Sequence, residues 1–385
     1  TDAFFESFSG LTTTGATVIE GIDFLPHSVQ FYRQQLQWLG GMGIIVLAVA
    51  ILPILGVGGM QLYRAETPGP VKDNKMTPRI ADTAKHLWYI YLSITIACAG
   101  AYWLAGMNVF DAICHSFSTV AIGGFSNHDA SLGYFNSPMV NVVCTVFLLI
   151  AALNFSLHYA AVSSRSVKGY FNDPEFKAFF IIQASLIGIC FLVLTLSGYY
   201  SSAEQALDQA MIQAVSISTT AGFATTDFSV WPAFLPIMLI FSSFIGGCAS
   251  STGGGLKVVR VCLLFLQGKR EVDRLIHPKA VYSVKFGDRA MPDRVVEAVW
   301  GFFSAYAVVF VIIMIGLIAT GLDNLSAFTA TAAMLNNLGP GLGSVAANYA
   351  DVTDAGKWIL VIAMVFGRLE VFSLLVLFSP TFWRS

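Results

Sequence analysis

The chain has 385 residues, of which 56% are hydrophobic and 11% are charged, whereas soluble domains carry charge on roughly a quarter of their residues. This composition excludes an ordinary soluble globule and a disordered chain. The formal net charge of −2 gives no field that would attract nucleic acid. The six cysteines are scattered and show neither the spacing of a zinc site nor that of a disulfide framework.

Seven long stretches that carry few or no charged residues follow one another along the chain. They lie between residues 33 and 64, 85 and 111, 129 and 165, 177 and 204, 227 and 257, 297 and 323, and 357 and 384, the last being interrupted by Arg368 and Glu370. About 20 apolar residues are enough for a helix to cross a bilayer core of roughly 30 Å. We therefore expect an all-α polytopic membrane protein.

The charged residues between these stretches predict the orientation of the protein. Most of the 21 Lys and Arg residues lie in the segments 64–85, 165–177 and 257–294 or at residue 384, and the positive-inside rule places such segments in the cytoplasm. The intervening segments hold about half of the acidic residues, including Glu20, Asp129 and Asp227. These acidic residues either only solvate the outer loops or attract cations to the outer face.

Four short runs of Ser, Thr and apolar residues, each built around glycine, lie in the outward segments. They are Thr13-Thr14-Gly15-Ala16-Thr17, Ala121-Ile122-Gly123-Gly124-Phe125, Thr220-Ala221-Gly222-Phe223-Ala224 and Asn337-Leu338-Gly339-Pro340-Gly341. The runs recur about once every hundred residues, and a few turns of helix-compatible sequence precede each. We therefore predict four pseudo-repeats, each made of a span, a re-entrant helix, an extended filter strand and a second span. Their boundaries are 1–65, 66–165, 166–275 and 276–385.

Backbone that is not helical at membrane depth is tolerated only where protein or a water-filled path surrounds it. Four such strands around one axis would meet this condition by lining a pore. Glycine adopts positive φ, so carbonyl oxygens near it can turn toward the axis and replace the hydration shell of a cation. The alternative is that the glycines only allow helices to pack closely.

These runs carry a resemblance to a known family. Together with Ser218–Phe223, Asn336–Gly341 and the closing Phe366-Gly367-Arg368-Leu369-Glu370-Val371, they resemble the Trk/Ktr/HKT superfamily of potassium transport proteins over essentially the whole chain. The bacterial Trk membrane subunit is the most similar branch. The resemblance implies four units around a pseudo-fourfold axis, as in a potassium channel, with Gly15, Gly123, Gly222 and Gly339 as the filter glycines.

The resemblance also implies which ion is bound and by which residues. In this family a glycine in the first filter goes with potassium and a serine with sodium, so Gly15 favours potassium. We expect the potassium-binding filter to comprise Thr13, Thr14, Gly15, Ala121, Ile122, Gly123, Thr220, Ala221, Gly222, Asn337, Leu338 and Gly339. None of the four runs is a full Thr-Val-Gly-Tyr-Gly, so we expect looser selectivity than in a potassium channel. The first span of repeat 1 is expected to be absent from this chain.

A glycine-rich segment interrupts the stretch 227–257. Glycine costs about 1 kcal/mol relative to alanine inside a helix, so Gly246, Gly247, Gly253, Gly254 and Gly255 predict a broken second span in repeat 3. A phosphate-binding loop is disfavoured because Leu256 separates the last glycine from Lys257. Close helix packing through small residues stays open. The resemblance favours a third possibility, a gating loop beneath the filter, with Lys257 at its end.

Arg368 lies about 15 Å along the last predicted span, where a charge is costly and indicates function. The resemblance implies that Arg368 faces the pore below the filter and hinders passing cations, so we assign it to the gate. The alternative is a structural ion pair with another repeat.

We therefore predict potassium uptake across the inner membrane of a bacterium, with potassium as the transported ion and with no tightly bound cofactor. A sodium-permeable or sodium-coupled transporter is the main alternative. A membrane-embedded enzyme is disfavoured because no catalytic grouping of residues is evident, and a scaffold would give the four runs no purpose. The expected partners are membrane lipid and, by the resemblance, a second copy of the chain in a homodimer and a cytoplasmic nucleotide-binding regulatory subunit (TrkA-like).

Overall fold

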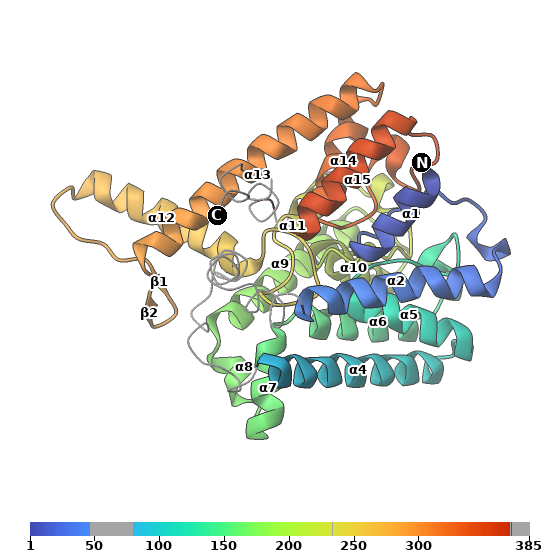
Figure 1. Cartoon of the computed structure of the whole chain (residues 1–385), viewed down its shortest axis with the longest axis horizontal. Coiled ribbons are helices and arrows are strands. Elements are labelled where there is room, and N and C mark those ends of the chain that lie inside the picture. The colour runs from blue at the N-terminus through green and yellow to red at the C-terminus, as the bar shows by residue number, and fades with distance from the viewer. Residues whose placement is uncertain (47–79, 233, 370, 372–385) are drawn as a thin grey trace.

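In this computed structural model the described residues are 1–46, 80–232, 234–369 and 371 (Figure 1). Regular structure in this part of the chain is almost entirely helical. The helices are α1 (Asp2–Leu11), η1 (Ile22–Phe24), α2 (His27–Val46), α4 (Ile80–Leu104), α5 (Val109–Ala121), η3 (Ser131–Phe135), α6 (Pro138–Ala151), α7 (Phe155–Ser164), α8 (Lys168–Asn172), α9 (Pro174–Leu196), α10 (Ala203–Ser218), η4 (Phe228–Val230), α11 (Leu235–Ser243), α12 (Val258–Ile276), α13 (Asp293–Ala319), α14 (Asn324–Leu335), η5 (Gly343–Val345) and α15 (Asp354–Arg368).

Long apolar helices confirm the predicted polytopic membrane fold. Within the described residues, α4, α9 and α13 contain segments long and apolar enough to cross a membrane. Large apolar side chains on their outer faces, such as Ile181, Leu192, Ile312 and Ile315, are exposed and therefore available to lipid. The C-terminal parts of the spans predicted at 33–64 and 357–384 lie outside the described residues.

The stretch predicted as a span at 129–165 is not one continuous helix, because the chain bends by 88° between α6 and α7. Asn154 explains the break, since its side chain accepts a hydrogen bond of 2.8 Å from the Ser156 amide and caps the new helix. The carbonyl of Ala152, which α6 leaves unpaired, accepts a bond of 2.8 Å from the Cys248 amide in the glycine-rich segment. Partners distant in the sequence therefore compensate the lost helical hydrogen bonds.

Four short helices, α1, α5, α10 and α14, precede the four glycine runs, as predicted. Three of them begin at side-chain caps, namely Asn108, Ser202 and Asp323, which satisfy amides at the helix N-terminus. Each short helix packs against the second span of the preceding predicted repeat: α5 on α2, α10 on α6, α14 on α11, and α1 on α15. Because α15 closes back onto α1, the helices form a ring rather than a row.

One part of the molecule extends away from the helical bundle (Figure 1). It consists of α12, the beginning of α13 and an antiparallel hairpin of β1 (Lys285–Phe286) and β2 (Arg289–Ala290), in which Phe286 pairs with Arg289. Phe286 belongs to one buried apolar cluster with Leu263 of α12 and Val299 of α13. Arg270 and Asp293 form an ion pair of 2.6 Å between the two helices. This extension coincides with the basic segment 257–294 that the sequence places in the cytoplasm.

Candidate cation pathway

The four glycine runs share one backbone conformation. In each run a non-glycine residue with positive φ precedes a glycine with positive φ by two positions. The pairs are Thr13 and Gly15, Ile122 and Gly124, Thr220 and Gly222, and Asn337 and Gly339. Because positive φ is uncommon for residues other than glycine, its recurrence at the same place in each run supports an equivalent role for all four.

This geometry corrects the predicted alignment of the second run by one residue. Gly124, not Gly123, has the positive φ of 76° that matches Gly15 and Gly222. The predicted triplet therefore begins one residue too early, since Ala121 is still the last residue of α5. Gly123 instead takes the place that Thr14 occupies in the first run, and its carbonyl remains part of the site. Because Gly123 and Gly124 are adjacent, the sequence alone does not show which of them aligns with Gly15 and Gly222.

The glycines and the carbonyls that precede them form a closed ring. Each glycine faces a carbonyl oxygen of the next run, and the last faces the first. The facing pairs are Gly15 with Gly123, Gly124 with Ala221, Gly222 with Leu338, and Gly339 with Thr14. A Cβ atom at any of these glycines would lie too close to the facing oxygen. Glycine is therefore required for space as well as for φ.

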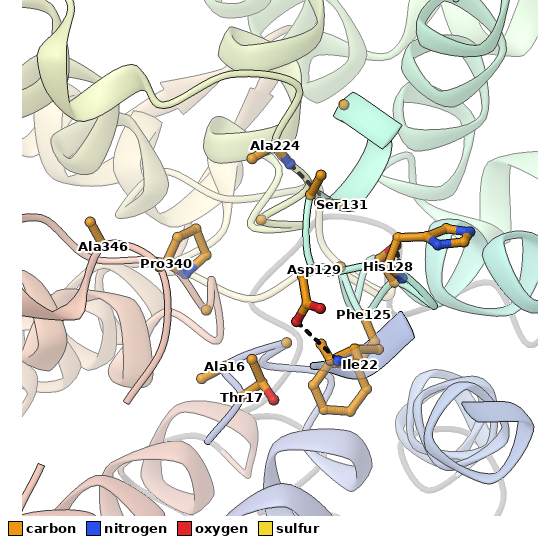
Figure 2. Close-up of a pocket in the computed structure, with 18 of the residues that line it drawn as sticks. Ala16, Thr17, Ile22, Phe125, His128, Asp129, Ser131, Ala224, Pro340 and Ala346 are labelled. Atoms are coloured by element: carbon orange, nitrogen blue, oxygen red, sulfur yellow. Dashed lines mark hydrogen bonds between the residues drawn. The ribbon is translucent and has the colours of Figure 1, made fainter. Parts of the chain in front are cut away.

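A cavity of about 470 Å³ lies on the outer side of this ring. Figure 2 shows that four separate parts of the chain surround it, with Thr17, Phe125, Ala224 and Pro340 among the lining residues. The carboxylates of Asp129 and Asp227 also line this cavity. A cation entering here would meet acidic side chains first and the ring of carbonyl oxygens next.

Buried polar side chains hold the outer ends of the first two runs. The carboxylate of Glu6 forms an ion pair of 2.7 Å with Arg33 and accepts hydrogen bonds from the Thr17 hydroxyl and the Val18 amide. Arg33 also donates to the Ser126 carbonyl at 3.1 Å. Glu6 and Arg33 together therefore connect two neighbouring runs, a link that the sequence did not reveal.

At the outer rim, His128 lies between two carboxylates. Its Nδ1 contacts Asp23, and its Nε2 lies 3.2 Å from Asp111 Oδ2. Burial by itself would lower the pKa of His128, but the hydrogen bonds with Asp111 and Asp23 outweigh it and raise that pKa above 6.5. Burial would likewise raise the pKa of Asp23, but the His128 hydrogen bond outweighs it and lowers that pKa below 3.8. His128 therefore ties η1 to α5, and the two carboxylates favour its protonated form.

The glycine-rich segment breaks its span as predicted, because α11 ends at Ser243 and α12 begins at Val258. We call residues 246–257 the intramembrane loop. It lies against the C-terminal ends of three of the four short helices: Thr252 Oγ1 donates to Val120 O at 3.0 Å, and the amides of Gly254 and Gly255 donate to Thr220 Oγ1 and Asn336 O. The loop therefore crosses the inner side of the carbonyl ring.

Two cationic side chains bind adjacent carbonyls of this loop. Arg368 donates to Thr252 O at 2.8 Å and to Gly40 O at 3.2 Å, and the Lys257 ammonium donates to Gly253 O. In the described part of the chain no carboxylate pairs with Arg368, so the alternative of an ion pair gains no support from these residues. Glu370 lies outside them.

Glu175, at the start of α9, is a buried acid that no sequence pattern indicates. Its Oε1 accepts hydrogen bonds from the Ala249 amide at 2.7 Å and the Val259 amide at 3.2 Å. The first bond holds the intramembrane loop, and the second caps the N-terminus of α12. Glu175 therefore fixes the loop to the helix that leads into the cytoplasmic extension.

Comparisons with known proteins agree with this geometry. The family model TrkH, described as a cation transport protein, matches residues 1–385. The chain is 68% identical to the Trk system potassium uptake protein TrkH of Vibrio parahaemolyticus and 64% identical to that of Escherichia coli, covering 100% of this chain and 80% of each relative. The crystal structure of the potassium transporter TrkH from Vibrio parahaemolyticus matches with a TM-score of 0.91 and 65% identity, covering 100% of this chain and 79% of that chain. The chain therefore belongs to the TrkH family of cation transport proteins and is a multi-pass protein of the bacterial inner membrane.

Proposed function

We propose that this protein takes up potassium through one central pore. The observation that carries the proposal is the closed ring in which each filter glycine faces a backbone carbonyl of the next run. Backbone carbonyls are the ligands that replace the hydration shell of potassium in selective channels. The relatives named as potassium uptake proteins, 64 to 68% identical to this chain, support the same ion. Their names describe transport rather than catalysis.

We assign the filter to the four runs, one from each of the repeats 1–65, 66–165, 166–275 and 276–385. The Thr14, Gly123, Ala221 and Leu338 carbonyls would form one layer of ligands. Thr13, Ile122, Thr220 and Asn337, which share positive φ, would lie next to it on the inner side. Ala121, at the end of α5, would help close the inner end of the filter.

The intramembrane loop acts as the gate in this proposal. It contacts three of the four short helices directly beneath the ring, so an ion leaving the filter would meet it. Arg368 and Lys257 bind its carbonyls and add positive charge on the pathway, which repels a dehydrated cation. Gly246, Gly247, Gly253, Gly254 and Gly255 would let the loop move aside when the gate opens.

The cytoplasmic extension is the natural docking face for a regulatory partner. The relatives are parts of a "Trk system", a name that implies further Trk components. We propose a nucleotide-binding subunit that binds near α12 and the hairpin, and a homodimer of pore subunits in the membrane. A partner that moves α12 would pull on the loop through Glu175, which binds both.

Cation uptake into proteoliposomes that contain the full-length protein tests the function. Potassium, rubidium and sodium are compared under one fixed gradient, with empty liposomes as the control. We expect potassium and rubidium to enter faster than sodium. Equal uptake of sodium would support the sodium-permeable alternative. If the wild type shows no flux, the Arg368→Ala variant removes a gate contact, and continued absence of flux would contradict the proposal.

A further inference from the structure

Four polar residues form one buried face of α2. Gln30, Arg33, Gln34 and Gln37 follow the spacing of three and four residues that places side chains on one side of a helix. Their exposed fractions are 4%, 3%, 0% and 0%. Buried polar groups cost free energy unless they are hydrogen-bonded, so this face needs partners on the element that it covers.

The partners lie one after another along the second filter run and its outward continuation. Arg33 donates to the Ser126 carbonyl at 3.1 Å, and Gln30 donates to the Asn127 carbonyl at 3.2 Å. Gln34 donates to the side chain of Asn127 at 3.3 Å. Helix α2, from the first repeat, therefore holds the strand of the second repeat along its length.

Gln37 occupies the inner end of this face, next to the carbonyl ring. Its Nε2 donates to the Gly123 carbonyl at 2.6 Å, and its Oε1 accepts from the Phe125 amide at 3.1 Å. One amide therefore binds both neighbours of Gly124. The packing is tight, since a Cβ atom at Gly123 would overlap the Gln37 side chain.

This contact makes the ring asymmetric. The Gly123 carbonyl is one of the four that face filter glycines. Among the described residues, no side chain donates a hydrogen bond to the equivalent carbonyls of Thr14, Ala221 or Leu338. One oxygen of the four is therefore tethered to a buried side chain on a membrane helix, and the other three lack such a tether among the described residues.

We propose that Gln37 is a positioning residue that makes the filter discriminate potassium from sodium. Sodium is the smaller ion, so its coordination requires the ring oxygens to move inward. The Gly123 oxygen cannot follow without losing its hydrogen bond to a side chain that has no water to replace it. The ring therefore stays at the width that suits potassium. This inference rests on the proposed function, because it assumes that the ring binds the transported ion.

The test compares the ratio of potassium to sodium permeability in three forms of the full-length transporter. Gln37→Met keeps the length of the side chain but has no donor. Its ratio should fall by roughly fivefold, the factor that corresponds to about 1 kcal/mol for one net hydrogen bond. Gln34→Met is the matched control, since it lies on the same buried face but contacts no ring carbonyl. Its ratio should stay within twofold of the wild type.

The results that would overturn the role of Gln37 differ from the result that would contradict the proposed function. An unchanged ratio in a folded Gln37→Met variant overturns the inference, and so does an equal fall in both variants, which would indicate general loosening of α2. If Gln37→Met does not fold, Gln37→Asn replaces it. Asparagine keeps the amide group, but its shorter side chain cannot reach the Gly123 carbonyl, so we expect the same fall in the ratio of potassium to sodium permeability. A wild type that does not distinguish the two ions contradicts the proposed function itself rather than the role of Gln37.

Discussion

The carbonyl ring and the intramembrane loop lie next to each other on the proposed pathway, yet they are held in different ways. Buried side chains bind the ring and the strand next to it: Gln37 binds the ring carbonyl of Gly123, and the Tyr349 hydroxyl donates to the carbonyl of the filter glycine Gly339 at 2.8 Å. The intramembrane loop binds its neighbours mainly through its own backbone groups. Among the side chains that it contacts are two cations, Arg368 and Lys257, and the buried carboxylate of Glu175.

This difference has a physical meaning. A selective site must keep its oxygens fixed while ions pass, and fixed side chains on packed helices provide that. A gate must break its contacts and form them again, so contacts that are individually small and made by a glycine-rich backbone suit it. The two regions therefore predict opposite responses to mutation: damage to the ring stops transport, and damage to the loop contacts increases it.

The largest effect is expected in the ring. Gly124→Ala places a methyl group against the Ala221 carbonyl and forces a residue with a side chain to adopt a φ of 76°. We expect rubidium uptake to fall by roughly 100-fold or more, the scale seen when a catalytic or binding geometry is displaced by about 1 Å. Gly100→Ala is the control, since nothing lies within 4 Å of a Cβ atom there. Normal uptake by Gly124→Ala would exclude the ring as the ion site.

A smaller effect concerns the ion pair that connects the first two runs. Glu6→Gln leaves the buried Arg33 charge without its partner, which costs roughly 3–5 kcal/mol of stability in buried pairs. Arg274→Gln is the control, since it removes the exposed pair of Arg274 and Glu271 on α12, and it should cost about 1 kcal/mol or less. Thermal unfolding in detergent measures both. Equal shifts for the two variants would mean that the Glu6 pair contributes no more than a surface contact.

In the intramembrane loop we expect mutation to increase uptake rather than to decrease it. Arg368→Ala removes the donor to Thr252 O and Gly40 O and a positive charge beneath the filter. We expect uptake without the regulatory partner to rise by roughly tenfold, which corresponds to about 1.4 kcal/mol less barrier. Arg368→Lys keeps the positive charge but loses the planar guanidinium. Its uptake should lie between that of the wild type and that of Arg368→Ala. Lower flux in Arg368→Ala would contradict the role of a barrier.

The smallest effect is a pH dependence at the outer rim. The pKa of His128 is raised above 6.5 in the folded protein, so its stabilising contacts are complete below that pH and are lost as the pH rises through the folded-state pKa. The lowered pKa of Asp23 keeps that carboxylate charged throughout this range. The difference in Tm between the wild type and His128→Gln should therefore shrink by about 2 °C from pH 6 to pH 9. A Tm difference that does not change with pH would contradict a stabilising role for protonated His128.

The sequence predicted the parts of the molecule that depend on local rules. Apolar length predicted the spans, and the backbone freedom of glycine predicted both the four runs and the broken helix at 244–257. It could not choose between Gly123 and Gly124, because both residues allow positive φ and only the facing carbonyls decide. It also missed the bend after Ala151, since an asparagine within an apolar stretch gives no sign that a distant loop will bind there.

The side chains behind the filter were missed for a related reason. Gln37 binds a carbonyl 86 residues away, and Glu175 binds an amide 74 residues away. No local pattern pairs such residues. One sign was nevertheless present: Gln30, Arg33, Gln34 and Gln37 form a polar face on a helix that enters the membrane, and such a face requires buried partners.

The most direct test of the central claim is a crystal structure of the full-length protein with rubidium in place of potassium. We expect an anomalous peak on the axis of the ring, within coordination distance of the Thr14, Gly123, Ala221 and Leu338 carbonyls. The Gly124→Ala protein should lose this peak under the same conditions. Rubidium found only beside the carboxylates of Asp129 and Asp227, with none at the ring, would contradict the central claim.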